Sequence, residues 1–224
     1  MCNAYYLSTP PAKLMDLFGL TDAEAPVLEN PRFAPTDLVP VVLNVAPRRL
    51  SVAKWGLIPF WAQDPKVGVK MFNARAEGIA EKPAFRAAVQ RKRCLVLADG
   101  FYEWRKNPDG TKTPIRYALE SGRPFAFAGL WELWRPPAMD PVRSCTIITT
   151  QANPLVAPIH DRMPVILERA DESLWLKADE ESIEEALALL QPYPADRMTA
   201  TELPQGIPGA RPPRSNPAKR LPAT

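Results

Sequence analysis

Proline is spread along the whole of this 224-residue chain, which contains 27 prolines. Average usage in proteins is about 5%, so the content here is well above the norm. The proline ring fixes φ and removes a backbone donor, and a proline inside a helix therefore breaks it. We expect short strands separated by turns and no long helix. The pattern predicts an α+β fold: a single domain of short, mostly antiparallel strands that form a barrel-like core, with a few short helices.

Three short helices are expected. The first begins at Ser8-Thr9-Pro10, where a hydroxyl cap precedes a proline of the first turn, and ends near Gly19. A second, at about 180–191, has apolar residues at helical spacing. A third, at about 84–90, follows Pro83.

Strands occupy most of the remaining chain in this prediction. A turn signal, Asn107-Pro108-Asp109-Gly110, places a hairpin after residues 101–104. The cluster Arg91-Lys92-Arg93 is interpreted as a solvated strand entry. The expected strands are 38–45, 50–55, 93–98, 115–119, 125–130, 145–150 and 165–167.

The end of the chain differs in composition from the rest. After Glu202 there is no acidic residue, whereas four basic residues and six prolines fall at 204–224. Such a segment has little to bury. We therefore expect one domain at 1–203 and a Pro-rich, basic tail at 204–224 that is extended or disordered.

Composition also limits the class of protein. No apolar run reaches the roughly 18 residues of a membrane span, and the first twenty residues lack a signal core. We expect a cytoplasmic monomer. Three cysteines without a Cys-x-x-Cys pair, together with a single histidine, support neither a disulfide framework nor a metal site. No metal and no cofactor are expected.

Cys2 is the first candidate for chemistry. Initiator methionine is usually removed when so small a side chain follows, and Cys2 then carries an amine and a thiol on adjacent carbons. Their ordinary pKa values are near 8 and 8.5, so some of each is reactive at neutral pH. The amine can condense with an aldehyde to an imine, and the tethered thiol can close a five-membered thiazolidine.

Three further polar residues stand in apolar or turn-forming segments: Asn73, Glu103 and His160. Glu103 lies among aromatic residues, where lost hydration raises the pKa of a carboxyl group toward that of a general acid or base. An outward-pointing Glu103 is the alternative. His160, the only histidine, stands between Pro158 and Pro164, which restrict the loop that carries it.

Arginines and tryptophans near these positions are candidate nucleic-acid contacts. Arg75 follows Asn73 by two residues, which on a strand places both on the same side. Arg75 and Arg162 can grip phosphate bidentately. Trp61 and Trp104 can stack on bases, although most tryptophans belong to the core.

Six short segments, taken together and in order, resemble one known family. The family is SRAP, the SOS response-associated peptidases or abasic-site processing proteins, and the resemblance covers residues 2 to about 167. The segments are Met1-Cys2, Asn44-Val45-Ala46-Pro47, Trp55-Gly56-Leu57-Ile58-Pro59, Asn73-Ala74-Arg75-Ala76-Glu77, Asp99-Gly100-Phe101-Tyr102-Glu103-Trp104 and Ile159-His160-Asp161-Arg162-Met163-Pro164.

The resemblance implies a DNA damage response protein that binds single-stranded DNA and captures abasic sites as a thiazolidine on Cys2. It implies that Asn73 holds Cys2 and the opened sugar, and that Glu103 orients the amine and moves protons. His160 would assist opening of the deoxyribose. The protein would associate with the nucleoid when bound to DNA.

By the same resemblance, the phosphates that flank the abasic site would contact Arg75 and Arg162. Trp61 and Trp104 would shape the nucleotide pocket. The peptidase label would refer to release of the residue before Cys2, by this chain or by an aminopeptidase.

The segment after Cys2 departs from the family pattern, which begins Cys-Gly-Arg, since this chain has Asn3-Ala4. Three other readings stay open. One is an amidohydrolase with an N-terminal nucleophile, although no glycine-rich oxyanion segment is present. Another is a peptidase that pairs Cys2 with His160. The third is a single-strand DNA binder without catalysis.

Overall fold

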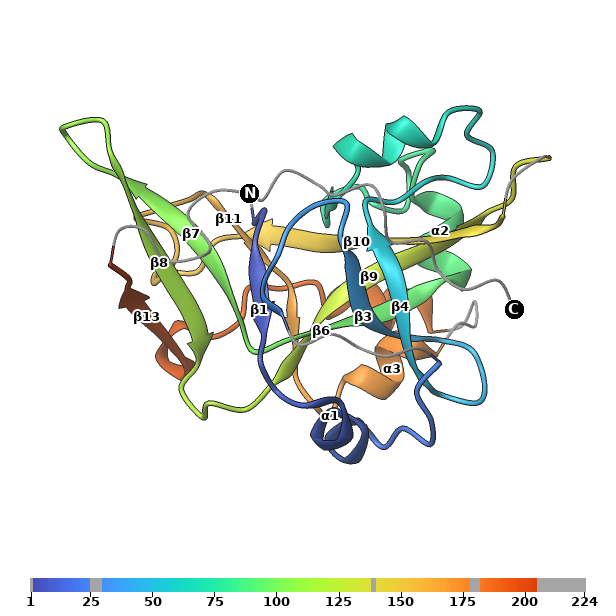
Figure 1. Ribbon diagram of the computed structural model, residues 1–224, viewed down its shortest axis with the longest axis horizontal. Helices are drawn as coiled ribbons and strands as arrows, with labels where there is room; N and C mark the ends of the chain where they lie inside the picture. The colour runs from blue at the N-terminus through green and yellow to red at the C-terminus, as the bar shows by residue number, and fades with distance from the viewer. Residues whose placement is uncertain (1, 25–29, 138–139, 178–181, 205–224) are drawn as a thin grey trace.

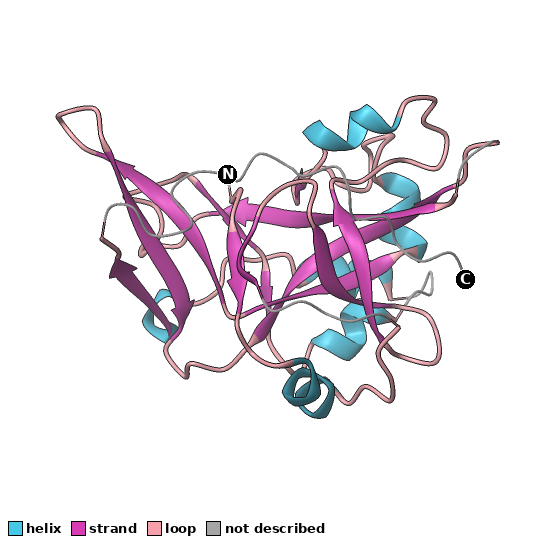
Figure 2. Ribbon diagram, viewed as in Figure 1, coloured by secondary structure: helices cyan, strands magenta, loops and turns pink. Residues whose placement is uncertain are grey.

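The computed structural model describes residues 2–24, 30–137, 140–177 and 182–204. Strands make up most of the described chain, and the helices are short and lie at its periphery (Figure 2). The predicted α+β fold with a barrel-like core is confirmed. Among the described residues, no helix is long and apolar enough to cross a membrane.

One sheet closes on itself into a five-stranded barrel. The ring runs β10–β4–β3–β6–β9 and returns from β9 to β10, and β11, β5 and β12 extend it. All pairings are antiparallel except those of β10 with β4 and with β5. The strands are β3 (Leu38–Leu43), β4 (Leu50–Trp55), β5 (Asn73–Arg75), β6 (Arg93–Ala98), β9 (Phe125–Trp134), β10 (Val142–Gln151), β11 (Arg162–Pro164) and β12 (Ile166–Leu167).

A second sheet of five strands lies beside the barrel, to its left in Figure 1. Its order is β13–β8–β7–β1–β2. The predicted turn at Asn107–Gly110 joins its central hairpin, in which Phe101 pairs with Tyr117 and Lys106 with Lys112. The strands are β1 (Tyr5–Leu7), β2 (Asn30–Phe33), β7 (Gly100–Lys106), β8 (Lys112–Leu119) and β13 (Met198–Glu202).

Aromatic residues of both sheets meet in one continuous core. The Tyr5 ring of β1 lies 5.3 Å from the Trp55 ring of β4 and 5.7 Å from the Phe127 ring of β9. All three side chains are buried. Strand β1 therefore packs against the barrel while it pairs with β7, and the residues that precede it are held where the two sheets meet.

The short helices are α1 (Pro11–Phe18), α2 (Arg86–Arg91), α3 (Glu172–Leu176) and α4 (Ile183–Ala188), with 3₁₀ turns η1 (Pro65–Lys70) and η2 (Ala195–Arg197). Within the described residues, α1, α2 and α4 lie at the predicted places, whereas α3 was not predicted. Helix α1 ends at Gly19 with φ of 60°, a left-handed cap. The start predicted for the α4 helix, near residue 180, and the tail at 205–224 lie outside the described residues.

Two local interpretations are wrong. Ser8 and Thr9 do not cap α1, because both hydroxyls and both backbone N–H groups donate to the carboxylate of Asp99. Arg93 is not solvated: it is fully buried, and its guanidinium donates to the carbonyl oxygens of Val89, Trp175 and Lys177. In both cases hydrogen-bond partners are distant in sequence: Asp99 accepts from Ser8 and Thr9, and the carbonyls of Trp175 and Lys177 accept from Arg93.

Candidate functional site

Cys2 lies buried at the junction of the two sheets. The backbone N–H of Tyr102 in β7 donates to the carbonyl oxygen of Ala4 across 2.9 Å, which places the N-terminal segment along that strand. The Cys2 thiol lies 3.5 Å from the same oxygen and donates to it. The segment before β1 is thus held in a defined position.

Asn73 contacts Cys2 directly. It is the first residue of β5, which pairs in parallel with β10, and its Nδ2 donates to the carbonyl oxygen of Cys2 across 2.7 Å. The other amide atom, Oδ1, is buried and has no hydrogen-bond partner within the described chain. A buried acceptor of this kind is costly unless a donor reaches it, so Asn73 offers an acceptor next to Cys2.

Glu103 is buried in β7, with only 5% of its surface exposed. The interpretation of an outward-pointing side chain is therefore wrong. It pairs across the hairpin with the core residue Ile115. Burial raises the pKa of Glu103 to about 7, because the charged form loses hydration. The carboxyl group can therefore accept or release a proton at neutral pH.

The Cys2 thiol is kept protonated by the same surroundings. Burial raises its pKa well above the ordinary value, and the nearby charge of Glu103 adds to the effect. A thiol in this state needs a base before it attacks. Glu103 is an ionisable group close enough for its charge to act on the thiol.

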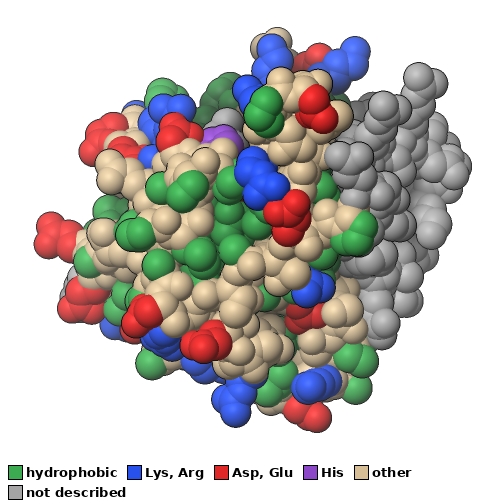
Figure 3. Space-filling model, turned by 90° about the vertical axis from the view of Figure 1, so that its left-hand side faces the viewer, with side chains coloured by type: hydrophobic (Ala, Val, Ile, Leu, Met, Phe, Trp, Pro, Cys, Tyr) green, Lys and Arg blue, Asp and Glu red, His purple; other side chains and the backbone are tan. Residues whose placement is uncertain are grey.

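His160 precedes β11, and its side chain is partly exposed; the histidine is visible in Figure 3. Its Nδ1 lies 3.0 Å from the backbone N–H of Arg162 and 2.8 Å from Oδ1 of Asp161. Nδ1 cannot accept one bond and donate the other at once. Burial lowers the pKa of His160, while the Asp161 carboxylate opposes this. Neutral imidazole accepts from Arg162, and the protonated form donates to Asp161.

The two arginines differ in environment. Arg75 is exposed and lies on the same side of β5 as Asn73. Arg162 is buried, and its guanidinium binds both carboxylate oxygens of Glu77, at 2.6 and 2.8 Å. Phosphate contact by either arginine stays a prediction. Glu77 was not among the predicted site residues. The sequence feature that could have identified it is its place at the end of the family segment that begins at Asn73.

The two tryptophans lie apart. Trp61 is 53% exposed in the loop after β4. Trp104 is next to Glu103 on β7, and successive side chains of a strand point to opposite faces. Trp104 shares its face with Tyr102 and pairs with Pro114, whereas Glu103 points toward the core. The structure therefore does not bring Trp104 to the side of β7 that carries Glu103.

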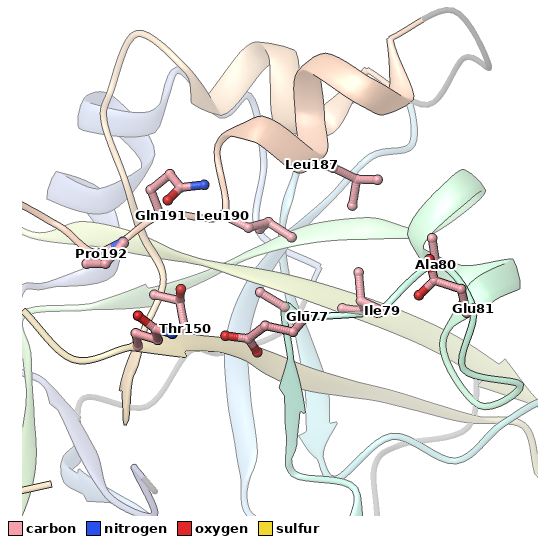
Figure 4. Close-up of a pocket in the computed structure, with 12 residues that line it drawn as sticks. Glu77, Ile79, Ala80, Glu81, Thr150, Leu187, Leu190, Gln191 and Pro192 are labelled. Atoms are coloured by element: carbon pink, nitrogen blue, oxygen red, sulfur yellow. The ribbon is translucent and has the colours of Figure 1, made fainter. Parts of the chain in front are cut away.

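Glu77 also lines a cavity of about 460 Å³, together with Thr150, Leu187 and Leu190 among others. Figure 4 shows the Glu77 carboxylate turned toward Thr150, with Leu187 and Leu190 across the cavity. None of the four predicted catalytic residues lines it. Within the described ranges, no group of three or more His, Cys, Asp or Glu side chains could hold a metal ion.

A protein-family model matches most of the chain. The model of the SOS response associated peptidase (SRAP) family matches residues 1–208. Three relatives are each called an abasic site processing protein. YoqW of Bacillus subtilis is 42% identical over 206 residues, which cover 91% of this chain and 92% of YoqW. YoaM of the same organism is 41% identical over 226 residues (100% and 98%). HMCES of Xenopus tropicalis is 36% identical over 168 residues (65% and 50%).

Solved structures share the fold. A protein from Bacteroides thetaiotaomicron superposes with a TM-score of 0.83 at 26% identity, covering 91% of this chain and 93% of that one. A protein from Bordetella bronchiseptica gives 0.78 at 28% identity, with 91% and 100% covered.

Proposed function

Because the chain belongs to the SOS response associated peptidase (SRAP) family, we propose that it is an abasic-site processing protein that captures the aldehyde of an abasic site in single-stranded DNA through Cys2. Relatives over 90% or more of its length carry the name abasic site processing protein. The observation that carries the proposal is the hydrogen bond from Asn73 to the Cys2 carbonyl. It holds an N-terminal thiol beside a carboxyl group whose pKa is about 7.

After Met1 has been removed, the capture proceeds through an imine to a closed ring. The Cys2 amine attacks the aldehyde carbon of the ring-opened deoxyribose, and the carbinolamine that forms loses water to give an imine. The thiol sulfur then attacks the imine carbon, and its proton passes to the nitrogen. The product is a thiazolidine whose mass is that of protein plus DNA minus one water.

Glu103 supplies the proton transfers in this scheme. As a carboxylate it takes a proton from the Cys2 ammonium or thiol, and as a carboxylic acid it returns one to the departing hydroxyl. A pKa of about 7 suits both directions at neutral pH. Neutral His160, with Nδ1 occupied by the Arg162 N–H, presents Nε2–H to the ring oxygen of the deoxyribose when the sugar opens.

DNA contacts are assigned by exposure. Exposed Arg75, on the same face of β5 as Asn73, holds a phosphate next to the lesion. Exposed Trp61 stacks on a neighbouring base. Arg162 can add a second phosphate contact only through its remaining donors, because Glu77 occupies both terminal nitrogens.

Intact mass spectrometry tests the proposal. Met1-processed protein is incubated with a single-stranded oligonucleotide that carries one abasic site, and with the undamaged oligonucleotide. Cys145→Ala, which removes another buried thiol, serves as the matched control for Cys2→Ala. A heat-stable adduct of protein plus DNA minus water is expected for the wild type and Cys145→Ala, and none for Cys2→Ala.

No adduct from wild-type protein with Met1 confirmed absent would refute the capture. Retained DNA binding would then favour the non-catalytic binder. Hydrolysis of amide or peptide substrates that depends on Cys2 would favour the amidohydrolase or peptidase.

A further inference from the structure

The ion pair between Glu77 and Arg162 is unlike an ordinary surface pair. The Arg162 side chain is only 10% exposed, whereas that of Glu77 is 53% exposed. Both terminal nitrogens of Arg162 bind the Glu77 carboxylate, in the bidentate geometry that fixes a guanidinium plane. Exposed pairs contribute about 0–1 kcal/mol, but a buried charge that loses its partner is strongly unfavourable. Glu77 therefore determines where the Arg162 guanidinium lies.

One backbone oxygen joins this pair to the barrel. The carbonyl of Thr149 in β10 accepts from Arg162 Nη2 at 2.5 Å and from the backbone N–H of Ala76 at 2.8 Å. Ala76 opens a tight turn, closed by a 3.1 Å bond from the Ile79 N–H to the Ala76 carbonyl, with Gly78 at a φ of +65°. The backbone of Glu77 therefore lies within a hydrogen-bonded turn that is joined to β10.

The two residues of the pair lie next to the two segments that carry Asn73 and His160. Glu77 follows β5, whose first residue, Asn73, holds the Cys2 carbonyl. Arg162 begins β11, and its backbone N–H donates to Nδ1 of His160. The pair therefore spans from the strand that positions the nucleophile to the loop that positions the histidine.

We propose that Glu77 is a positioning residue: through Arg162 it fixes the relative placement of Asn73 and His160 around the bound deoxyribose. This inference rests on the proposed function. The carboxylate does not touch the sugar in this scheme. It holds the buried guanidinium, and that guanidinium holds β5, β10 and β11 together.

The test compares Glu77→Gln with Glu81→Gln. Both remove one carboxylate from the rim of the same cavity, but only Glu77 binds Arg162. Adduct formation is followed in single-turnover experiments at increasing concentrations of abasic single-stranded DNA. For Glu77→Gln we expect the maximal rate to fall about tenfold, the order of loss that misplaced reacting groups cause, with little change in the half-saturating DNA concentration. Glu81→Gln should behave as wild type.

A second readout needs no DNA. His160 is the only histidine, so its imidazole resonances need no assignment. The charge of Arg162 already lowers the pKa of His160, and loss of the Glu77 charge leaves that guanidinium less neutralised. The pKa of His160 should therefore fall further in Glu77→Gln and stay at the wild-type value in Glu81→Gln. This shift reports whether Glu77 neutralises Arg162 beside His160, whereas a pair that only stabilised the fold would leave the maximal rate of folded protein unchanged.

The outcomes separate the two proposals. An unchanged maximal rate in folded Glu77→Gln, or tighter DNA binding with a faster reaction, would overturn the positioning role while leaving aldehyde capture intact. Absence of an adduct from the wild type would refute the proposed function instead. If Glu77→Gln proves unfolded by circular dichroism, Glu77→Asp keeps the charge with a shorter reach and should lower the maximal rate to a smaller extent.

Discussion

The side-chain amide of Asn73 lies 2.7 Å from the backbone carbonyl of Cys2 and donates to it across 71 positions of sequence. This bond holds the main chain of Cys2 and leaves its thiol to the separate contact with the Ala4 carbonyl.

Asn73→Ala should slow adduct formation at least about tenfold, because Cys2 loses its anchor, and should cost about 1 kcal/mol of unfolding free energy. Asn44→Ala is the matched control, since Asn44 likewise donates through Nδ2 to a backbone carbonyl, that of Arg91, and its Oδ1 accepts from Trp131. Urea unfolding and single-turnover kinetics measure the two effects. Equal kinetic effects in the two variants would contradict a specific role for Asn73.

Glu103→Gln should change the pH dependence of both stability and reaction. Burial raises the pKa of Glu103 from 4.5 to about 7, so the native state binds more protons than the unfolded state between these values. Stability therefore falls as the pH rises through this window, and the variant removes that fall. Its adduct rate should be low and without a transition near pH 7.

Glu172→Gln is the control for Glu103→Gln. Burial also raises the pKa of Glu172 to about 7, but this residue lies in α3, in an ion pair with Arg169. Urea unfolding at pH 5 and pH 8 should show a reduced pH dependence in both variants, whereas only Glu103→Gln should alter the rate profile of adduct formation. A normal profile in Glu103→Gln would remove Glu103 from the proton transfers.

His160 should be neutral at pH 7, with its proton on Nε2. Burial lowers the pKa of His160, and the Asp161 charge partly opposes this. Asp161→Asn should therefore lower the pKa further. Nitrogen-15 NMR of the single imidazole reports both the pKa and the tautomer, and a pKa that rises in Asp161→Asn would contradict the assignment.

Arg75→Gln should weaken binding to single-stranded DNA and reduce its salt dependence. Loss of one phosphate contact lowers the slope of log K against log salt by about 0.7 for a single strand. Lys13→Gln makes the same change of charge at an exposed position of α1 and should leave the slope unchanged. Fluorescence anisotropy at several salt concentrations gives both slopes.

Trp61→Ala should cost about 1–3 kcal/mol of single-strand binding, the usual contribution of a stacked base, without loss of stability, because its ring is more than half exposed. Trp104→Ala should leave the affinity unchanged and lower the melting temperature, because its partly buried ring points away from Glu103. The reverse pattern would exchange the roles of these two residues.

Much of the fold follows from local signals. Strands β4 and β6 coincide with the predicted 50–55 and 93–98, and the turn at Asn107–Gly110 joins the predicted hairpin. These features depend on residues within a few positions of one another: a proline, a glycine, or an alternation of apolar and polar side chains. The candidate catalytic residues are likewise recognisable from the short sequence segments that contain them.

The sequence by itself determined many of the short elements, the candidate Cys2 and the family segments. Only the tertiary structure decided which of these residues meet. Asn73 donates to Cys2, Glu77 binds Arg162, and Asp99 accepts from the hydroxyls of Ser8 and Thr9. Barrel closure and sheet pairing bring together these residues, which are 71 to 91 positions apart in sequence. The same pairing buries Arg93 and turns Glu103 inward and Trp104 outward, since a side chain's environment depends on what packs against its face of the strand.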